Sequence, residues 1–258
     1  MKPAVCAIIQ ARIGSSRLPG KVLRRIDGKP LLGLMLERSA FARGLDQVIV
    51  ATTDATADNA IARLCDDLGV SCFRGSENDV LDRYYAAATE FCAEAVVRLT
   101  SDCPLIDPAV IDHVVAEFNK GGFDYVSNTA PLPSTWPDGM DVEVFSFEAL
   151  RSAWRQAVKP SDREHVTFYL WKNPTRFRVH RVDCERDLSE YRLTVDYQQD
   201  FELVEAVFRA LYPSNPAFTI DDITAYLDDN PNVKRLNEGI VRNAGWQAAY
   251  EKDTKAGF

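Results

Sequence analysis

Short apolar runs alternate with helical patterns through the first half of this chain, and this alternation limits its fold more than any other feature. The runs have the length of buried strands, and between them apolar residues recur every three or four positions. The expected strands are 5–10, 47–52, 71–73, 95–99 and 124–127, and the expected helices are 30–42, 56–68, 79–92 and 108–119. Strands joined through helices form a mostly parallel sheet that helices cover on both faces. The sequence therefore predicts an α/β fold.

The alternation of expected strands and helices ends after residue 130. A proline-rich loop at 131–137 precedes an alternating strand at 141–145, which we expect at a sheet edge or in a separate ribbon. Further helices are expected at 146–158, 162–171, 200–212 and 219–227, and short strands at 176–182 and 192–195. Beyond Asn230 the periodicity weakens, and we expect residues 251–258 to fray. We divide the chain into one α/β domain, 1–228, and a C-terminal helical extension and tail, 229–258.

The composition fits a globular protein with a large core and excludes several classes of function. The 258 residues are 46% hydrophobic and 26% charged, as expected of one large α/β domain. A formal net charge of −8 argues against nucleic acid as a partner. No apolar stretch reaches the roughly 18 residues of a membrane span, so no membrane partner is expected. The six cysteines lack metal-binding spacing, which predicts free thiols and a cytoplasmic location.

A basic loop follows the first expected strand. Between positions 11 and 21 it carries two glycines, two serines and three cations, Arg12, Arg17 and Lys21. Glycine lets backbone N–H groups approach an anion, and Arg and Lys bind phosphate oxygens. A strand followed by such a loop is typical of a triphosphate site in an α/β sheet. An ordinary basic surface loop is the alternative.

This loop is not a P-loop. Gly20 and Lys21 match the end of that motif, but Ser15 stands where its first glycine belongs. Val22 stands where the Mg²⁺-binding Ser or Thr belongs. P-loop kinases and ATPases are therefore disfavoured, and a metal ion must be bound by other residues.

Two aspartates are candidate metal ligands. Asp102 follows the strand at 95–99, and Asp196 follows the short strand at 192–195. The carboxyl ends of parallel strands form the ligand-binding edge of an open sheet, and Mg²⁺ usually takes one or two carboxylates there. The alternative for Asp102 is that it caps a turn. We expect Asp107 to be a helix N-cap and Asp200 to lie in the first turn of a helix.

Several segments occur in an order that resembles one known family. They are A-R-x-G-S-S-R-L-P-G-K-V-L (11–23), F-R-G-S-E-N-D-V-L-D-R-Y (73–84), D-C-P-L-I-D-P (102–108), Y-V-S-N-T (125–129), D-G-M-D-V-E-V-F (138–145), R-E-H-V-T (163–167) and R-L-T-V-D (192–196). Together they resemble the cytidylyltransferases of the spore-coat polysaccharide biosynthesis type. That group is similar to the acylneuraminate and 3-deoxy-manno-octulosonate cytidylyltransferases. The resemblance covers about residues 4–212.

The resemblance implies a Rossmann-like sheet of the nucleotide-diphospho-sugar transferase type and a homodimer. It implies that an acidic sugar or related acceptor attacks the α-phosphate of CTP, that pyrophosphate leaves, and that the product serves surface polysaccharide synthesis. Arg12, Lys21, Asp102 and Asp196 would be catalytic, the two aspartates binding Mg²⁺, with Mn²⁺ as the alternative. The other implied nucleotide-binding residues are Ala11, Gly14, Ser15, Arg17, Arg74, Arg83, Thr100 and Ser101. The implied acceptor-binding residues are Asn128, Asp138, Glu143, Arg163 and His165, mostly within an acceptor or dimer subregion at 129–182.

The sequence departs from the family pattern at two places. Thr100-Ser101-Asp102 replaces a Gln-x-Asp, which leaves the choice between CTP and another nucleoside triphosphate open. The segment 197–200 replaces the usual T-P-E-D after Asp196. His165 is a candidate base for the acceptor hydroxyl, with a second metal ion as the alternative. A nucleotide-sugar-dependent glycosyltransferase and an inactive nucleotide-binding module are the competing functions.

Overall fold

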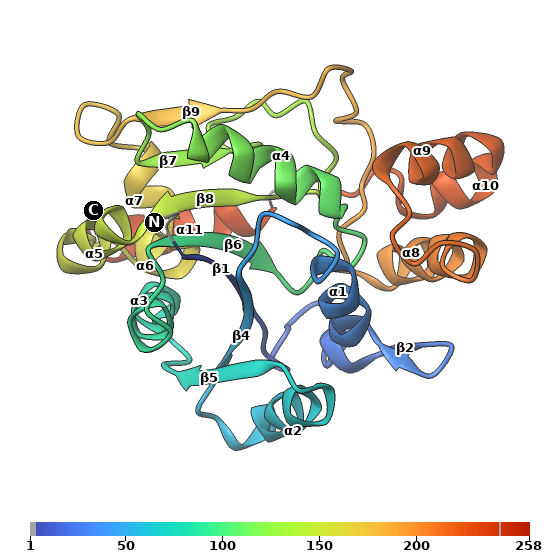
Figure 1. Ribbon diagram of the computed structural model, residues 1–258, viewed down its shortest axis with the longest axis horizontal. Helices are drawn as coiled ribbons and strands as arrows, with labels where there is room; N and C mark the ends of the chain where they lie inside the picture. Colours follow the sequence, from blue (N-terminus) through green and yellow to red (C-terminus); the bar gives the residue numbers. More distant parts are fainter. Residues whose placement is uncertain (1–3, 243) are drawn as a thin grey trace.

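A seven-stranded, mostly parallel sheet lies at the centre of the computed structural model, which describes residues 4–242 and 244–258 (Figure 1). The strand order is β5-β4-β1-β6-β8-β7-β9. The strands are β1 (Val5–Gln10), β4 (Gln47–Thr53), β5 (Ser71–Gly75), β6 (Ala95–Thr100), β7 (Tyr125–Ser127), β8 (Glu143–Ser146) and β9 (Val179–Arg181). Only β8 runs antiparallel to its neighbours β6 and β7 among the described strands of this sheet. The predicted α/β class is confirmed.

Both faces of the sheet are buried, as the apolar runs predict. Along β1, Val5, Ala7 and Ile9 pack into one hydrophobic core, and Cys6 and Ile8 pack into the other. The first core is covered by α1 (Leu31–Ser39), α2 (Asn59–Leu68), α4 (Pro108–Asn119), α8 (Gln198–Leu211) and α9 (Ile220–Asp229). The second is covered by α3 (Val80–Glu90), α5 (Phe147–Gln156) and α7 (Phe168–Trp171). Figure 1 shows α3 and α5 on one side of the sheet and α1 and α2 on the other.

Smaller elements complete the chain. They are η1 (Lys21–Leu23), β2 (Arg25–Ile26), β3 (Lys29–Pro30), η2 (Thr56–Asp58), α6 (Pro160–His165), α10 (Pro231–Lys234), η3 (Arg235–Asn237) and α11 (Ala244–Lys255). The helix starts follow local capping chemistry. Asp107 accepts a hydrogen bond from the N–H of Ala109, which confirms it as the N-cap of α4. Thr219 and Asp222 form the capping box that opens α9.

Four local predictions are wrong. The strand predicted at 141–145 begins at Glu143 and lies inside the sheet, where it pairs with both β6 and β7 and packs Val144 into the first core and Phe145 into the second. The segment 192–195 is irregular and forms a single bridge, from Arg192 to Asp138. The helix predicted at 162–171 is broken into α6 and α7, because Val166 adopts a φ of 60°. Residues 251–255 continue α11, where packing against α6 replaces the predicted fraying.

The carboxyl ends of β1 and β6 lie side by side. Gln10 pairs with Thr100 in the register of these two parallel strands. The loop that leaves β1 and the turn that leaves β6 therefore emerge at the same edge of the sheet. Open α/β sheets bind their ligands at this edge.

Candidate active site

The basic loop after β1 is held by its own backbone and by one buried aspartate. The N–H of Gly20 donates to the carbonyl of Ile13 over 3.1 Å, which closes the loop. The N–H of Ile13 donates to Asp58 over 2.8 Å, and Asp58 is only 3% exposed. The loop ends in the short turn η1, which begins at Lys21. A fixed loop of this kind presents its cations from defined positions.

Lys21 joins the two aspartates that the sequence singles out. Its ammonium lies 3.2 Å from a carboxylate oxygen of Asp102 and 2.8 Å from one of Asp196. It also donates to the carbonyl of Val195 over 2.7 Å, and Arg17 reaches Asp196 over 2.7 Å. Although burial opposes ionisation, Lys21 lowers the pKa of Asp102 to about 2. The two carboxylates therefore lie on either side of one cation, and Asp102 is held in its charged form.

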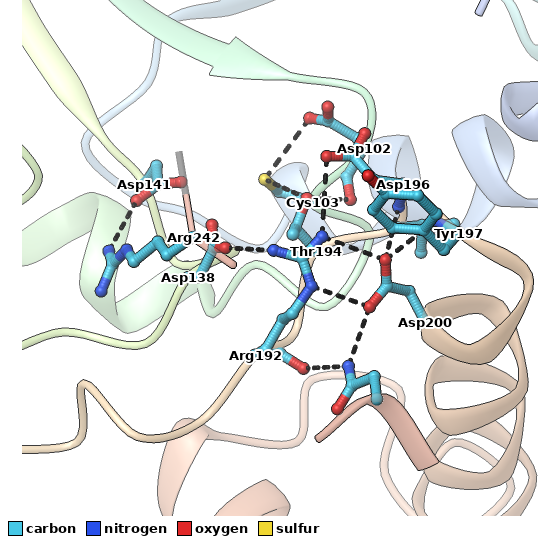
Figure 2. Close-up of polar contacts among 12 residues, drawn as sticks. Asp102, Cys103, Asp138, Asp141, Arg192, Thr194, Asp196, Tyr197, Asp200 and Arg242 are labelled. Atoms are coloured by element: carbon cyan, nitrogen blue, oxygen red, sulfur yellow. Dashed lines mark hydrogen bonds and ion pairs between the residues drawn. The ribbon is translucent and has the colours of Figure 1, made fainter. Parts of the chain in front are cut away.

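A largely buried arginine, Arg192, fixes the position of Asp196. Arg192 lies between Asp138, at 2.6 Å, and Asp200, at 2.9 Å (Figure 2). Asp200 has no exposed surface and accepts the N–H groups of Asp196 and Tyr197, each over 2.9 Å. Its placement at the start of α8 confirms the prediction that it lies in the first helical turn. Apart from the single bridge to Asp138, the irregular segment is thus held by these ion pairs and hydrogen bonds, which place Asp196 beside the ammonium that also contacts Asp102.

Gly139 allows this segment to pass close to the turn before β8. Its φ is +108°, and an added Cβ would lie 2.5 Å from the backbone carbon of Leu193 and from the backbone nitrogen of Thr194. We therefore expect Gly139→Ala to lower the free energy of unfolding by about 2–4 kcal/mol. Urea unfolding measures this loss. Gly28→Ala is the matched control, because Gly28 also has a positive φ of +84° but an added Cβ there meets nothing within 4 Å. Equal losses in the two variants would contradict the close approach at Gly139.

Two cavities meet at the aspartate pair. The first, of about 400 Å³, is called the loop cavity because the basic loop lines it. The second, of about 210 Å³, is called the carboxylate cavity because Asp138, Asp141 and Glu143 line it. Both cavities are lined by Gln10, Arg17, Asp102, Asp196, His165 and Gly245. A group bound in one cavity can therefore approach a group bound in the other beside the two aspartates.

Most of the predicted nucleotide-binding residues line the loop cavity. They are Ala11, Arg12, Ser15, Arg17, Lys21, Arg83 and Ser101. Thr100 lines the carboxylate cavity instead. Arg74 turns away from both cavities and donates to the carbonyls of Thr53 and Ala55, so it holds the turn after β4. Gly14 lies near the side chain of Glu77 and lines neither cavity.

The predicted acceptor-binding residues divide into two groups. Asp138, Glu143 and His165 line the carboxylate cavity. Asn128 is buried and donates to the carbonyl of Met140, so it braces the turn before β8. Arg163 pairs with Asp79 and donates to the carbonyl of Trp154 over 2.7 Å, which ties α6 to α3 and α5. Asn128 and Arg163 therefore contact other parts of the protein and do not line the carboxylate cavity. That the other three contact an acceptor stays a prediction.

Two arginines that sequence reasoning missed lie in the carboxylate cavity. Arg98, on β6, pairs with Glu143, which also accepts the hydroxyls of Tyr125 and Thr167. Arg192 pairs with Asp138. A charged residue inside the apolar run A-V-V-R-L-T was the signal for Arg98, and the quoted motif R-L-T-V-D already contained Arg192. Together with Arg17, these two arginines bring positive charge to the carboxylate cavity.

Asp138 and Asp141 repel each other across the carboxylate cavity. Burial and the charge of Asp141 raise the pKa of Asp138 to about 7. Burial also raises the pKa of Asp141, which accepts the hydroxyl of Thr129 over 2.8 Å and lies 3.8 Å from Arg242 (Figure 2). This part of the cavity therefore favours the protonated form of a carboxyl group, so it offers both a hydrogen-bond donor and oxygen acceptors to a polyhydroxylated ligand.

His165 lies at the junction of the two cavities and lines both of them. Burial, together with the charge of Arg98, lowers the pKa of His165 to about 4, against the opposing charges of Glu164 and Glu143. Its Nε2 atom is buried and has no hydrogen-bond partner among the described residues. The ring stacks on Phe168 with a centroid distance of 4.4 Å. An uncharged imidazole can accept a proton.

This lowered pKa predicts a pH dependence of stability. Between pH 6.5 and 4 the unfolded chain binds a proton at His165 and the folded chain does not, so stability falls as the pH falls through this window. Glutamine does not titrate, so His165→Gln removes this pH-dependent part of the free energy of unfolding. We expect the stability advantage of the wild type over this variant to shrink by roughly 2 kcal/mol between about pH 7 and pH 4.5. Urea unfolding at both pH values measures the difference, and parallel pH profiles would contradict it.

Cys103 lies between these charged groups as an unionised thiol. Its sulfur lies 3.3 Å from the hydroxyl of Thr100 and 3.6 Å from a carboxylate oxygen of Asp102. Burial and the charge of Asp102 raise the pKa of the thiol well above its ordinary value. A thiol that stays protonated is a poor nucleophile, which argues against a catalytic role for Cys103.

The aspartate pair fits a divalent cation. Asp102 and Asp196 both reach the ammonium of Lys21, so their oxygens already converge on a positive charge. No cluster of three or more acidic, His or Cys side chains with metal-binding geometry occurs within residues 4–242 and 244–258. Mg²⁺ does not require one, because it commonly takes one or two carboxylates and completes its shell with phosphate oxygens and water. The donor set therefore suits Mg²⁺ held together with a nucleotide.

A basic loop and an aspartate pair at the carboxyl edge of a parallel sheet, between two adjoining cavities, define an α/β enzyme of the nucleotidyltransferase class. The sequence model of the family described as "Cytidylyltransferase" matches residues 6–228. The chain belongs to this cytidylyltransferase family.

Similar proteins agree with this assignment. The spore coat polysaccharide biosynthesis protein SpsF of Bacillus subtilis (strain 168) is 34% identical, over 90% of this chain and 97% of its own length. The 3-deoxy-manno-octulosonate cytidylyltransferase of Anaeromyxobacter sp. (strain K) is 40% identical, over 82% of this chain and 93% of its own. A solved cytidylyltransferase structure from Leptospira borgpetersenii superposes with a TM-score of 0.84 at 33% identity, over 94% of this chain and all of the other. The resemblance stated from the motifs is confirmed.

Proposed function

We propose that this enzyme transfers CMP from CTP to a hydroxyl group of an acidic sugar or related acceptor, in a reaction that requires Mg²⁺ and releases pyrophosphate. The product would serve the synthesis of a surface polysaccharide or glycan. The observation that carries the proposal is the meeting of the loop cavity and the carboxylate cavity at Lys21, Asp102 and Asp196. We assign the triphosphate to the loop cavity and the acceptor to the carboxylate cavity.

The cations of the loop cavity bind and orient the nucleotide in this proposal. Arg12, Arg17 and Lys21 line the cavity and offset the negative charge of the phosphates. Asp102 and Asp196 would hold Mg²⁺, which when bound spreads charge away from the α-phosphate and aligns the leaving group. Mn²⁺, with its similar preference for oxygen ligands, is the alternative ion. Lys21 would have to move off the aspartates when the metal ion and phosphates arrive.

The acceptor hydroxyl attacks the α-phosphate from the carboxylate cavity. A bond forms between the acceptor oxygen and the α-phosphorus, the bond to the bridging oxygen of the β-phosphate breaks, and pyrophosphate carries away the electron pair. His165 lines both cavities and is uncharged, and its Nε2 atom is buried, so Nδ1 is the atom that would take the hydroxyl proton. Positioning and charge do most of the work, and no covalent enzyme intermediate is needed.

An acidic acceptor would bind to the arginines of the carboxylate cavity. Arg98 and Arg192 both line it, and each is already paired with a carboxylate. The carboxylate of the acceptor would bind these guanidinium groups alongside Glu143 and Asp138. The hydroxyl groups of the acceptor would donate to Asp138 and Asp141.

A homodimer and a cytoplasmic location belong to the same proposal. For the dimer contact we propose the stretch 131–145, which interrupts the alternation of strands and helices. Most of this stretch is buried within the chain, so the contact would lie at its exposed start, where Leu132 is 44% exposed. All six cysteines are free thiols, which fits a reducing compartment. No helix among the described residues has the length and apolar character needed to cross a membrane.

A substrate matrix tests the proposed function. Each of the four nucleoside triphosphates is combined with a panel of acidic sugars in the presence of Mg²⁺, and pyrophosphate release is measured. We expect release with CTP and at least one acidic sugar, and none without an acceptor. Turnover of a nucleotide sugar without use of any triphosphate would support glycosyl transfer instead. Nucleotide binding without any turnover would support an inactive binding module.

A further inference from the structure

The C-terminal helix α11 lies outside the matched region 6–228, yet it lines both cavities. Gly245, Ala248 and Lys252 line the loop cavity, at the spacing of one helix face. Gly245 and Trp246 line the carboxylate cavity, together with Val241, which precedes the helix. Residues of α11, beyond the region that the family model matches, therefore form part of the walls of both cavities.

The helix is anchored beside the site by a buried carboxylate. Asp253 is 7% exposed and accepts the N–H and the hydroxyl of Ser161, over 2.8 and 2.6 Å. Lys252 pairs with Glu164 over 2.6 Å. Both contacts hold α11 against α6, the helix that ends at His165. The position of α11 is thus fixed relative to the base at the junction.

An aromatic cluster sets the orientation of Trp246. Its ring lies 4.9 Å from that of Phe168 and 5.8 Å from that of Trp171, between centroids. Its centroid lies 6.4 Å from that of His165. An aromatic ring held in this way at a cavity wall presents a rigid apolar surface at little entropic cost.

Gly245 leaves the junction of the two cavities open. It lines both of them, and an added Cβ would meet nothing within 4 Å. Its φ lies outside the left-handed region, so a larger residue is not strained there. A larger side chain at this position would therefore extend into the space where acceptor and nucleotide meet.

We propose that α11 selects the acceptor: Trp246 packs against the carbon skeleton of the acidic sugar, and Gly245 leaves the room that its reacting end requires. This inference rests on the proposed function, because it assigns the carboxylate cavity to the acceptor. It adds a specificity element that lies outside residues 6–228, the region that the family model matches.

Three variants of the full-length enzyme test the proposal. We expect Gly245→Leu and Trp246→Ala each to raise the KM of the acceptor about tenfold or more, on the scale of lost or blocked apolar contacts. We expect Trp246→Ala to leave the Kd of CTP, measured by calorimetry, unchanged. Gln247→Leu is the control, since Gln247 is an exposed neighbour on the same helix. Leucine favours a helix more than glycine does, so Gly245→Leu should not unfold α11.

The outcomes separate this inference from the proposed function. A shift of Gly245→Leu toward shorter acceptors supports the inference. An active wild type whose Gly245→Leu and Trp246→Ala variants match Gln247→Leu overturns the inference and leaves the function standing. Weaker CTP binding by Trp246→Ala, with an unchanged acceptor KM, overturns it as well. A wild type that turns over no triphosphate with any acidic sugar overturns both.

Discussion

Replacing Lys21 by alanine is expected to lower the kcat/KM for CTP by at least about a hundredfold, which corresponds to roughly 2.7 kcal/mol of transition-state stabilisation. The ammonium of Lys21 is the cation that both Asp102 and Asp196 contact, at 3.2 and 2.8 Å. In the proposed reaction it offsets charge on the triphosphate, and alanine leaves that charge without a partner. The measurement is the rate of pyrophosphate release at varied CTP concentration.

Two further lysine variants separate catalysis from folding. Lys21→Gln keeps a donor for the carbonyl of Val195, which Lys21 contacts over 2.7 Å, but removes the charge. Lys29→Ala removes an exposed lysine that pairs with Glu37 over 2.9 Å, far from the site. We expect Lys21→Gln to lose activity with little change in circular dichroism, and Lys29→Ala to retain activity. Activity of Lys21→Ala within about threefold of the wild type would remove Lys21 from the mechanism.

Replacing Asp196 or Asp102 by asparagine is expected to lower the rate by at least about a hundredfold at fixed Mg²⁺, and to weaken metal binding in the presence of CTP. Asparagine keeps the shape of the side chain and one carbonyl oxygen, but it removes the charge that attracts a divalent ion. Electron paramagnetic resonance of Mn²⁺ in the presence of CTP measures the affinity of the metal ion directly.

Asp183→Asn is the matched control for these variants. Asp183 is an exposed aspartate that pairs with Arg181 over 2.8 Å, away from the aspartate pair. We expect this variant to bind Mn²⁺ and to react as the wild type does. If Asp196→Asn bound Mn²⁺ with wild-type affinity, the assignment of the metal ion to this pair would fail.

The fold follows from local sequence patterns because its core strands are continuous apolar runs. The run at 5–10 became β1, with alternate residues packed into the two cores, and Pro108 and Asn119 bound α4 as predicted. The strand at 141–145 was assigned to a sheet edge or a separate ribbon, because strand order depends on long-range pairing that local patterns do not show. β8 pairs with both β6 and β7, and the alternation of its polar and apolar residues does not predict either partner.

The part of the site that lies at the ends of these apolar strands could also be predicted. Asp102 and Lys21 lie in loops that leave adjacent parallel strands, so a strand-by-strand interpretation brings them to one edge. Asp196 was predicted to end a strand, yet Arg192 and Asp200 position it through a buried ion-pair network. The sequence contains no motif that places α11 at the site. Gly245 and Trp246 line the carboxylate cavity only because α11 packs against α6 in the folded chain.

A crystal structure of the enzyme with CTP and Mg²⁺ tests the central claim most directly. The account predicts three phosphates on the loop that carries Arg12, Arg17 and Lys21, and a metal ion bound by the carboxylates of Asp102 and Asp196. A nucleotide bound elsewhere, with that loop empty, or a metal ion that neither aspartate contacts, would contradict it.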